Sequence, residues 1–212
     1  MPSFEELVNS KPDLLSTVWL AINYCLPFYQ VLDQEILGFG QARELNRRYY
    51  EAAIKIALHY DGYWLEKEDI CDIIEELGNP PDVSHPIYII TIKDESFEKV
   101  VYVGKSSSDK SRFTSGHSAA IKLLNPMYNS FEKLIYFGQI MTSDKNDEYL
   151  PLEFVGDQVF AEQLLDDIES KVIQHFKPEL NTQKMRKVNI INEFSLLSVD
   201  YYSNNNLFDF SA

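Results

Sequence analysis

The chain has 212 residues and a formal net charge of −14, with 45% hydrophobic and 13% aromatic residues. This length suits one domain with a substantial extension or two small domains, and the apolar content excludes an intrinsically disordered chain. Such a negative charge repels nucleic acid at long range, so any surface that binds DNA must be a local basic patch on an acidic body.

Three further features of the sequence concern its cellular location. The longest apolar stretch, from Val18 to Ile22, is far too short to span a bilayer and is followed by Pro27. The first residues lack the basic, apolar and small-residue pattern of a secretory signal. The cysteines Cys25 and Cys71 lack the spacing of a metal or redox motif, and we expect both to be small core side chains. We therefore expect a cytoplasmic protein that does not associate with a membrane.

Residues 1–84 are predicted to be helical. Apolar residues at helical spacing predict one helix from Asp13 to about Gln30 and a second from Gln41 to Tyr60. The apolar stripe of the second helix comprises Leu45, Tyr49, Ala53, Ile56 and Tyr60. The arginines of this helix lie mostly outside the stripe. A third helix, Lys67 to Leu77, ends at a glycine before a proline-rich segment, which is the predicted domain boundary. No recognition-helix pattern of a helix-turn-helix is present, so we favour an extension that packs against the domain or binds a protein partner.

Two runs of β-branched and aromatic residues, Ile87–Ile92 and Val100–Val103, flank the polar segment DESFEK. Their composition is typical of strands, and the charged segment suits a hairpin turn. Antiparallel pairing would bring Tyr88 and Tyr102 into one region, and Gly104 permits another group to approach the backbone closely. On these residues alone, an ordinary amphipathic hairpin with two packing tyrosines is the plainest interpretation.

The region after the hairpin is predicted to be mixed. It comprises a helix at Ser111–Leu124, a third strand at Lys133–Met141, an acidic loop at Ser143–Leu152, and a long helix over residues 156–176 that stops before a proline. We therefore expect an α+β fold, in which a small antiparallel three-stranded sheet is flanked by helices and preceded by the helical N-terminal region. The predicted divisions of the chain are residues 1–84, 85–187 and a C-terminal tail, 188–212.

The long helix carries a carboxylate on its apolar side. The apolar arc comprises Ala161, Leu164, Leu165, Ile168, Val172, Ile173 and Phe176. Glu169 falls inside this arc, whereas Asp167 lies toward the opposite side. A core-facing carboxylate is costly unless it is paired or holds a cation. Glu169 therefore needs a metal ion, a hydroxyl, or an ion pair with Arg112 or Lys105. Glu162 shares the face but is nearer the helix start, where we expect it to be solvated.

The long helix is followed by the sequence KPELN, in which the proline stops the helix and directs Asn181 back toward the helix end. A turn asparagine of this kind is most often only a backbone cap. Basic residues gather in two patches beside these motifs, whereas acidic residues are concentrated in residues 66–76 and 144–169. The patches comprise Lys105, Lys110 and Arg112 in one group, and Lys177, Lys184, Arg186 and Lys187 in the other.

Taken together, these motifs resemble the GIY-YIG nuclease superfamily. The matching pieces are PIY at residues 86–88, YVG at residues 102–104, an arginine and a histidine on the following helix, a glutamate on a later helix, and a Pro-x-x-Asn turn. The resemblance covers residues 86 to about 185, and it depends on order and spacing because no single piece is specific. Pro86 stands where the family has glycine, a substitution that the first residue of a strand tolerates.

The resemblance implies a metal-dependent endonuclease that hydrolyses DNA phosphodiester bonds, of restriction or mobile-element type. It assigns catalytic roles to Tyr88, Tyr102, Arg112, His117, Glu169 and Asn181, and substrate binding to Lys105, Lys110, Arg112 and Lys184. One tyrosine would orient or deprotonate the attacking water, Arg112 would grip the scissile phosphate, and Glu169 would hold Mg²⁺ or Mn²⁺.

Two other interpretations are open. The net acidity favours a catalytically weak or inactive protein of the same fold that binds or regulates a partner. A different metal-dependent phosphodiesterase, or an unrelated α/β domain, would be favoured if the tyrosines lay far from Glu169.

Overall fold

The computed structural model describes residues 15–34, 36–57, 67–107, 118–144, 149–181 and 197–201 of the chain. The strands are β1 (Leu15–Pro27), β2 (Ile87–Lys93), β3 (Glu98–Lys105), β4 (Glu132–Asp144), β5 (Tyr149–Pro151) and β6 (Leu197–Tyr201). The α-helices are α2 (Phe39–Ala57), α3 (Lys67–Leu77), α4 (Ser118–Lys122) and α5 (Gln158–Phe176), and 3₁₀ turns span Phe28–Asp33 (η2), Pro126–Tyr128 (η3) and Leu152–Phe154 (η4). The predicted α+β class is confirmed.

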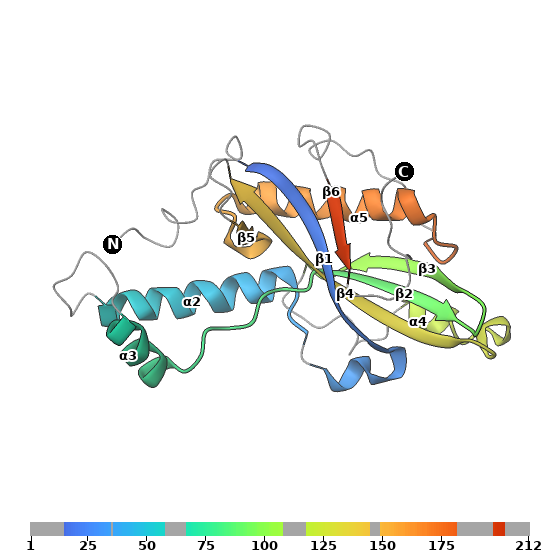
Figure 1. Cartoon of the computed structure of the whole chain (residues 1–212), viewed down its shortest axis with the longest axis horizontal. Helices are drawn as coiled ribbons and strands as arrows, with labels where there is room; N and C mark the ends of the chain where they lie inside the picture. The colour runs from blue at the N-terminus through green and yellow to red at the C-terminus, as the bar shows by residue number, and fades with distance from the viewer. Residues whose placement is uncertain are drawn as a thin grey trace.

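One sheet organises the described residues, with strand order β3-β2-β4-β1-β6 and with β5 paired to the end of β4. β2 pairs antiparallel with both β3 and β4, so the three predicted strands lie together as an antiparallel group. Six of the seven residues of β2 are buried, which explains why this strand is almost continuously apolar. Figure 1 shows the β2–β3 hairpin at one end of the molecule and α2 with α3 at the other.

The helix predicted from Asp13 to about Gln30 is wrong. Most of this segment is β1, which pairs antiparallel with β4 and parallel with β6. Val18, Leu20 and Ile22 are buried and alternate with less buried residues, which is the period of a strand. The sheet therefore extends across the predicted boundary near residue 84, and β6 places part of the C-terminal tail beside β1.

The other two helices predicted for the N-terminal region are confirmed as α2 and α3. α3 ends before Gly78, whose φ of +81° is the left-handed conformation that glycine favours after a helix. The buried residues of α2 include Phe39, Ala42 and Asn46, whereas Leu45 of the predicted stripe is exposed. The buried face of α2 is therefore rotated from the predicted stripe.

Two smaller predictions need correction. The predicted acidic loop, Ser143–Leu152, begins with the last residues of β4 and contains β5, while residues 145–148 lie outside the described part of the chain. Both cysteines, Cys25 and Cys71, are exposed and are not core side chains. In the described residues, no helix is long and apolar enough to cross a bilayer.

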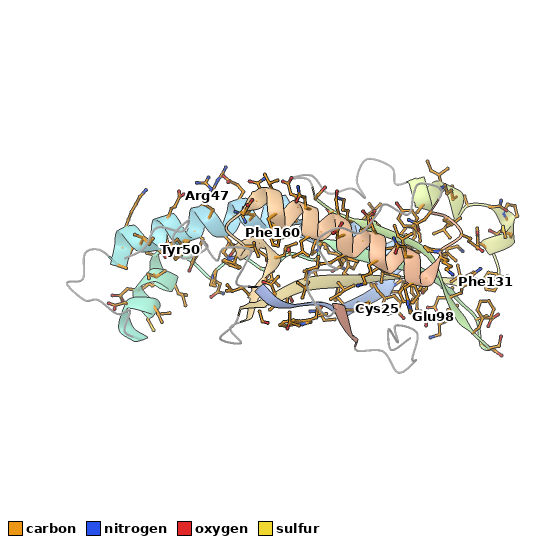
Figure 2. The ribbon with its side chains drawn as sticks, turned by 90° about the horizontal axis from the view of Figure 1, so that it is seen from above. Cys25, Arg47, Tyr50, Glu98, Phe131 and Phe160 are labelled. Atoms are coloured by element: carbon orange, nitrogen blue, oxygen red, sulfur yellow. The ribbon has the colours of Figure 1, made fainter. Side chains whose placement is uncertain are left out.

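The sheet separates two hydrophobic clusters. One contains Ile87 and Ile89 of β2 together with the buried stripe of α5. The other contains Tyr88 and Ile90 of β2 with Tyr128 from η3. Neighbouring residues of β2 therefore point to opposite faces, and the ring of Tyr88 lies on the face opposite α5. Figure 2 shows α5 running lengthwise along one side of the sheet.

Candidate functional site

The two tyrosines of PIY and YVG lie on the same face of the β2–β3 hairpin. Tyr88 pairs with Gly104, and Ile90 pairs with Tyr102. The tyrosine rings stack with centroids 6.1 Å apart and planes inclined by 23°. A Cβ at residue 104 would lie 2.4 Å from the Tyr88 hydroxyl oxygen, so glycine leaves the space that this ring occupies. The pairing register of PIY with YVG therefore brings the two phenol rings together.

The tyrosines differ in how accessible they are. Tyr88 is 0% exposed, whereas Tyr102 is only partly buried and packs against the cluster that contains Tyr88. A group that orients or deprotonates water must be within hydrogen-bond reach of it. Of the two predicted catalytic tyrosines, Tyr102 is therefore the more accessible, and Tyr88 stacks on its ring from within the core.

Asn181 pairs with the outer edge of β3. Its side-chain Oδ1 accepts a hydrogen bond from the Val103 N–H at 2.9 Å, and its Nδ2 donates to the Val103 carbonyl at 2.8 Å. The amide thus takes the place of a neighbouring strand, at the edge where β3 has no other partner strand among the described residues. The N–H of Leu180 also donates to the Val101 carbonyl at 3.0 Å. Asn181 is therefore fixed beside Tyr102.

The turn that carries Asn181 is held by further contacts through Glu179. This carboxylate forms an ion pair with Lys99 of β3 at 2.6 Å and accepts a hydrogen bond from the Tyr128 hydroxyl at 2.8 Å. The hydrogen bonds from Lys99 and Tyr128 hold the pKa of Glu179 below its ordinary value. Burial, together with the bond to Glu179, raises the pKa of Tyr128 to about 12. The turn is thus tied to both β3 and η3.

Lys105, the cation that follows YVG, forms an ion pair with Asp166 of α5, and the two side chains are 18% and 32% exposed. Glu169 follows Asp166 by three residues, so the two carboxylates are neighbours on the helix surface, and Glu169 is itself partly buried. α5 is tied to β3 by this ion pair and, just beyond its end, by the Leu180 bond. Glu169 lies between these two ties along the chain.

No family model, curated protein or solved structure matches the chain. The resemblance to GIY-YIG nucleases therefore rests on the sequence motifs alone. Tyr102 lies on the face of the sheet opposite α5, Asn181 lies at the edge of β3, and Lys105 is paired with α5, the helix that carries Glu169. The described residues therefore do not bring Tyr102 and Glu169 onto one face of the sheet.

Four of the predicted site residues, Lys110, Arg112, His117 and Lys184, lie outside the described residues. In the described part of the chain, no group of three or more histidine, cysteine or acidic side chains is arranged to hold a metal ion. A magnesium ion can be held by a single carboxylate together with water and phosphate oxygens, so Glu169 stays the predicted ligand. Glu162 is exposed, as predicted, and accepts a hydrogen bond from Gln158.

Two buried carboxylates were not indicated by the sequence. Asp167, predicted to lie on the outer side of α5, is only 7% exposed, so that prediction is wrong. Glu153 is 0% exposed and accepts hydrogen bonds from the N–H and the Oγ of Ser84, both at 2.7 Å. Burial raises the pKa of Glu153. Arg43 of α2 donates to the carbonyls of Glu153 and Val155 at 2.9 and 2.6 Å, so this network joins α2 to the segment before α5.

Proposed function

We propose that the protein is a metal-dependent endonuclease of the GIY-YIG type that hydrolyses phosphodiester bonds in DNA. In this proposal β2, β3 and β4, with α4 and α5, form the nuclease domain within residues 85–187, and β1 extends its sheet. The observation that carries the proposal is the stacked pair of tyrosines on β2 and β3, next to a strand edge that Leu180 and Asn181 complete. A cytoplasmic location belongs to the same proposal.

The residue types support this chemistry. Hydrolysis of a phosphodiester places negative charge on the transferring phosphate and on its leaving oxygen. Glu169, a partly buried carboxylate at the margin of the apolar stripe of α5, fits as the protein ligand of Mg²⁺ or Mn²⁺. When bound, the ion supplies charge stabilisation for the phosphate oxygens. The hydroxyl of Tyr102 would orient the attacking water or accept its proton, and Arg112 would bind the scissile phosphate through its planar fork.

The contribution of Lys105 to DNA binding depends on its ion pair with Asp166. Its ammonium group is paired with Asp166, and the pair is mostly buried. A phosphate that approaches Lys105 must therefore share the lysine with Asp166 or displace that carboxylate. We expect Lys105 to contribute less to DNA binding than an exposed lysine would.

Nicking of plasmid DNA in the presence of Mg²⁺ tests the proposal. The parent protein should nick the plasmid, and a chelator should abolish the activity. The Arg112→Ala and Glu169→Ala variants should each lose roughly 100-fold or more in rate, because each removes a charged group that acts on the transition state. Equal cleavage by these variants and the parent would refute the assignment.

A second candidate function is that of a binding or regulatory protein of the same fold without useful catalysis. Two observations favour this second function. The net charge is −14 and Lys105 is already paired, which disfavours DNA binding. Ile70 and Ile74 of α3 are also 46% and 39% exposed, which suits contact with a protein partner. It predicts a protein partner that docks on residues 1–84, and no cleavage with any metal. A salt titration of DNA binding separates the candidates, since affinity that falls with salt supports phosphate contacts, whereas no binding at low salt supports this second function.

A further inference from the structure

A pocket lies outside the candidate nuclease site, on β1 and the segment that leads into β2. Its volume is about 280 Å³, and its lining includes Asn23, Tyr24, Gln34, Asp82 and His85. None of these residues belongs to the motifs that resemble GIY-YIG nucleases. The pocket therefore has no role in the chemistry proposed above.

The shape of β1 presents an aromatic ring to this pocket. A register shift between Ile22 and Tyr24 leaves Asn23 unpaired in the ladder between β1 and β4, and such a bulge redirects the side chains that follow it. The Tyr24 hydroxyl donates a hydrogen bond to Oε1 of Gln34 at 2.8 Å, which fixes the ring. Because the Tyr24 side chain is still 39% exposed, part of this fixed ring is available to a ligand.

A row of residues across the sheet links the pocket to the candidate nuclease site. Tyr24 pairs with Phe137, Phe137 pairs with Tyr88, and Tyr88 pairs with Gly104. The rings of Tyr24 and Phe137 have centroids 6.1 Å apart, so Tyr24 is on the face that carries the two tyrosines of the hairpin. In the strand order β3-β2-β4-β1, the pocket lies three strand spacings from β3, or roughly 14 Å.

The polar groups of the pocket select the chemistry of its ligand. Among the described residues of its lining, Asp82 is the only carboxylate and there is no lysine or arginine, so an anionic ligand is disfavoured. His85 adds no charge at neutral pH, since burial lowers the pKa of its imidazole. The amides of Asn23 and Gln34 offer both donors and acceptors. The volume is below the roughly 300–1,000 Å³ of pockets for drug-sized ligands, which suits a single planar ring system.

We propose that this pocket binds an unstacked nucleobase with an exocyclic amino group, adenine or cytosine. The base stacks on Tyr24, and its amino group donates a hydrogen bond to Asp82. Stacking on an aromatic ring, combined with hydrogen bonds to the base edge, is how proteins hold bases that have left a duplex. A role in selecting the DNA substrate rests on the proposed nuclease function, whereas nucleobase binding itself does not. The roughly 14 Å between the pocket and β3 corresponds to about four nucleotides of a duplex strand at a rise of 3.4 Å per nucleotide.

An NMR titration of the full chain with free nucleosides, in the absence of metal, tests the pocket. Adenosine and cytidine should bind more tightly than inosine and uridine, whose ring carbonyls would face the Asp82 carboxylate. Tyr24→Leu should weaken adenosine binding roughly 5- to 150-fold, the range expected for loss of one base–aromatic stack. Tyr29→Leu is the matched control, because Tyr29 is 78% exposed and lies outside the pocket lining.

Two further variants keep the test decisive if Tyr24→Leu does not fold. Tyr24→Phe retains the ring and should bind adenosine within a few-fold of the parent. Asp82→Asn changes an exposed residue and should remove the preference for adenosine over inosine, because an amide can donate to a carbonyl as well as accept from an amino group. No nucleoside binding by the parent, or an unchanged preference in Asp82→Asn, would overturn the proposal.

Oligonucleotides separate a base within a strand from a free nucleoside. A thymidine oligomer with one central adenosine should bind more tightly than the all-thymidine oligomer and more tightly than free adenosine. Tighter binding of free adenosine would overturn the role in substrate recognition. Normal adenosine binding by a parent protein that does not cleave DNA would refute the nuclease and leave the pocket standing. Cleavage by a parent protein that binds no nucleoside would refute the pocket alone.

Discussion

The phenol of Tyr88 lies directly over the backbone of Gly104, its partner on the neighbouring strand. A Cβ at residue 104 would lie 2.4 Å from the hydroxyl oxygen and 2.5 Å from Cζ of Tyr88. An aromatic ring that covers a cross-strand glycine stabilises a sheet edge. Since the ring of Tyr102 stacks beside that of Tyr88, the PIY and YVG motifs form one structural unit in this protein.

We predict that Gly104→Ala destabilises the protein by about 1–3 kcal/mol, because the added methyl group meets a fully buried ring that cannot move without displacing the core. Chemical denaturation of the parent and the variant measures this difference. In a Tyr88→Ala background, where the ring is absent, the same glycine substitution should cost much less. Equal costs in the two backgrounds would show that Tyr88 does not constrain residue 104.

Asn181 is predicted to stabilise the fold in addition to any catalytic role. Asn181→Ala removes both hydrogen bonds to Val103, and the free energy of unfolding should fall by about 1–3 kcal/mol. Asn79→Ala is the matched control at an exposed turn position, and it should change stability by less than about 0.5 kcal/mol. Stability of Asn181→Ala equal to that of the parent would contradict the pairing with β3.

Glu153 gives a pH dependence with a definite sign. Burial raises its pKa in the folded state above the unfolded value, so folding favours the protonated form and stability falls as pH rises through the folded pKa. Glu153→Gln removes this titration while keeping groups that can bond Ser84. The free energy of unfolding of the variant, relative to the parent, should therefore increase between mildly acidic and neutral pH. If the difference in unfolding free energy between variant and parent were constant with pH, or decreased as pH rises, Glu153 would not have a pKa raised by burial.

Lys177 ends α5 with a φ of +47°, a left-handed conformation that side chains disfavour. Lys177→Gly should therefore stabilise the protein by roughly 0.5–1 kcal/mol and raise Tm by about 1–4 °C. Lys171→Gly, within the same helix, should do the opposite, because glycine in a helix interior costs about 1 kcal/mol. Thermal denaturation of both variants checks the prediction, and a loss of stability in Lys177→Gly would contradict it.

Local patterns were sufficient to predict β2, β3, β4 and α5. The run Ile87–Ile92 is dense in β-branched residues, and the arc of α5 that contains Leu164 and Ile168 repeats at the helical period. The sequence of each element therefore shows which of its residues are buried. β1 was misassigned because its apolar run is short enough to suit either period. The alternation of Val18, Leu20 and Ile22 was the signal that would have identified the strand.

The features that the sequence did not indicate are made by residues distant in the chain. The apolar pattern of α2 predicts that Arg43 lies off its stripe, yet this side chain bonds carbonyls more than a hundred residues away. The pattern of α5 predicts that Asp167 faces outward, yet it is buried. The Lys105–Asp166 pair likewise depends on how α5 lies against β3. Local periodicity carries no information on such contacts, because it records only the burial pattern of one element.

The most direct test of the proposed function compares two substitutions on one helix. DNA cleavage is measured against Mg²⁺ concentration for the parent, Glu169→Gln and Glu162→Gln. The parent and Glu162→Gln should cleave with the same metal dependence, because Glu162 is exposed and bonds Gln158 of its own helix, whereas Glu169→Gln should lose roughly 100-fold or more. Cleavage that is equal in the two variants, or absent from the parent at every metal concentration, would contradict the assignment of Glu169 as the metal ligand of a nuclease.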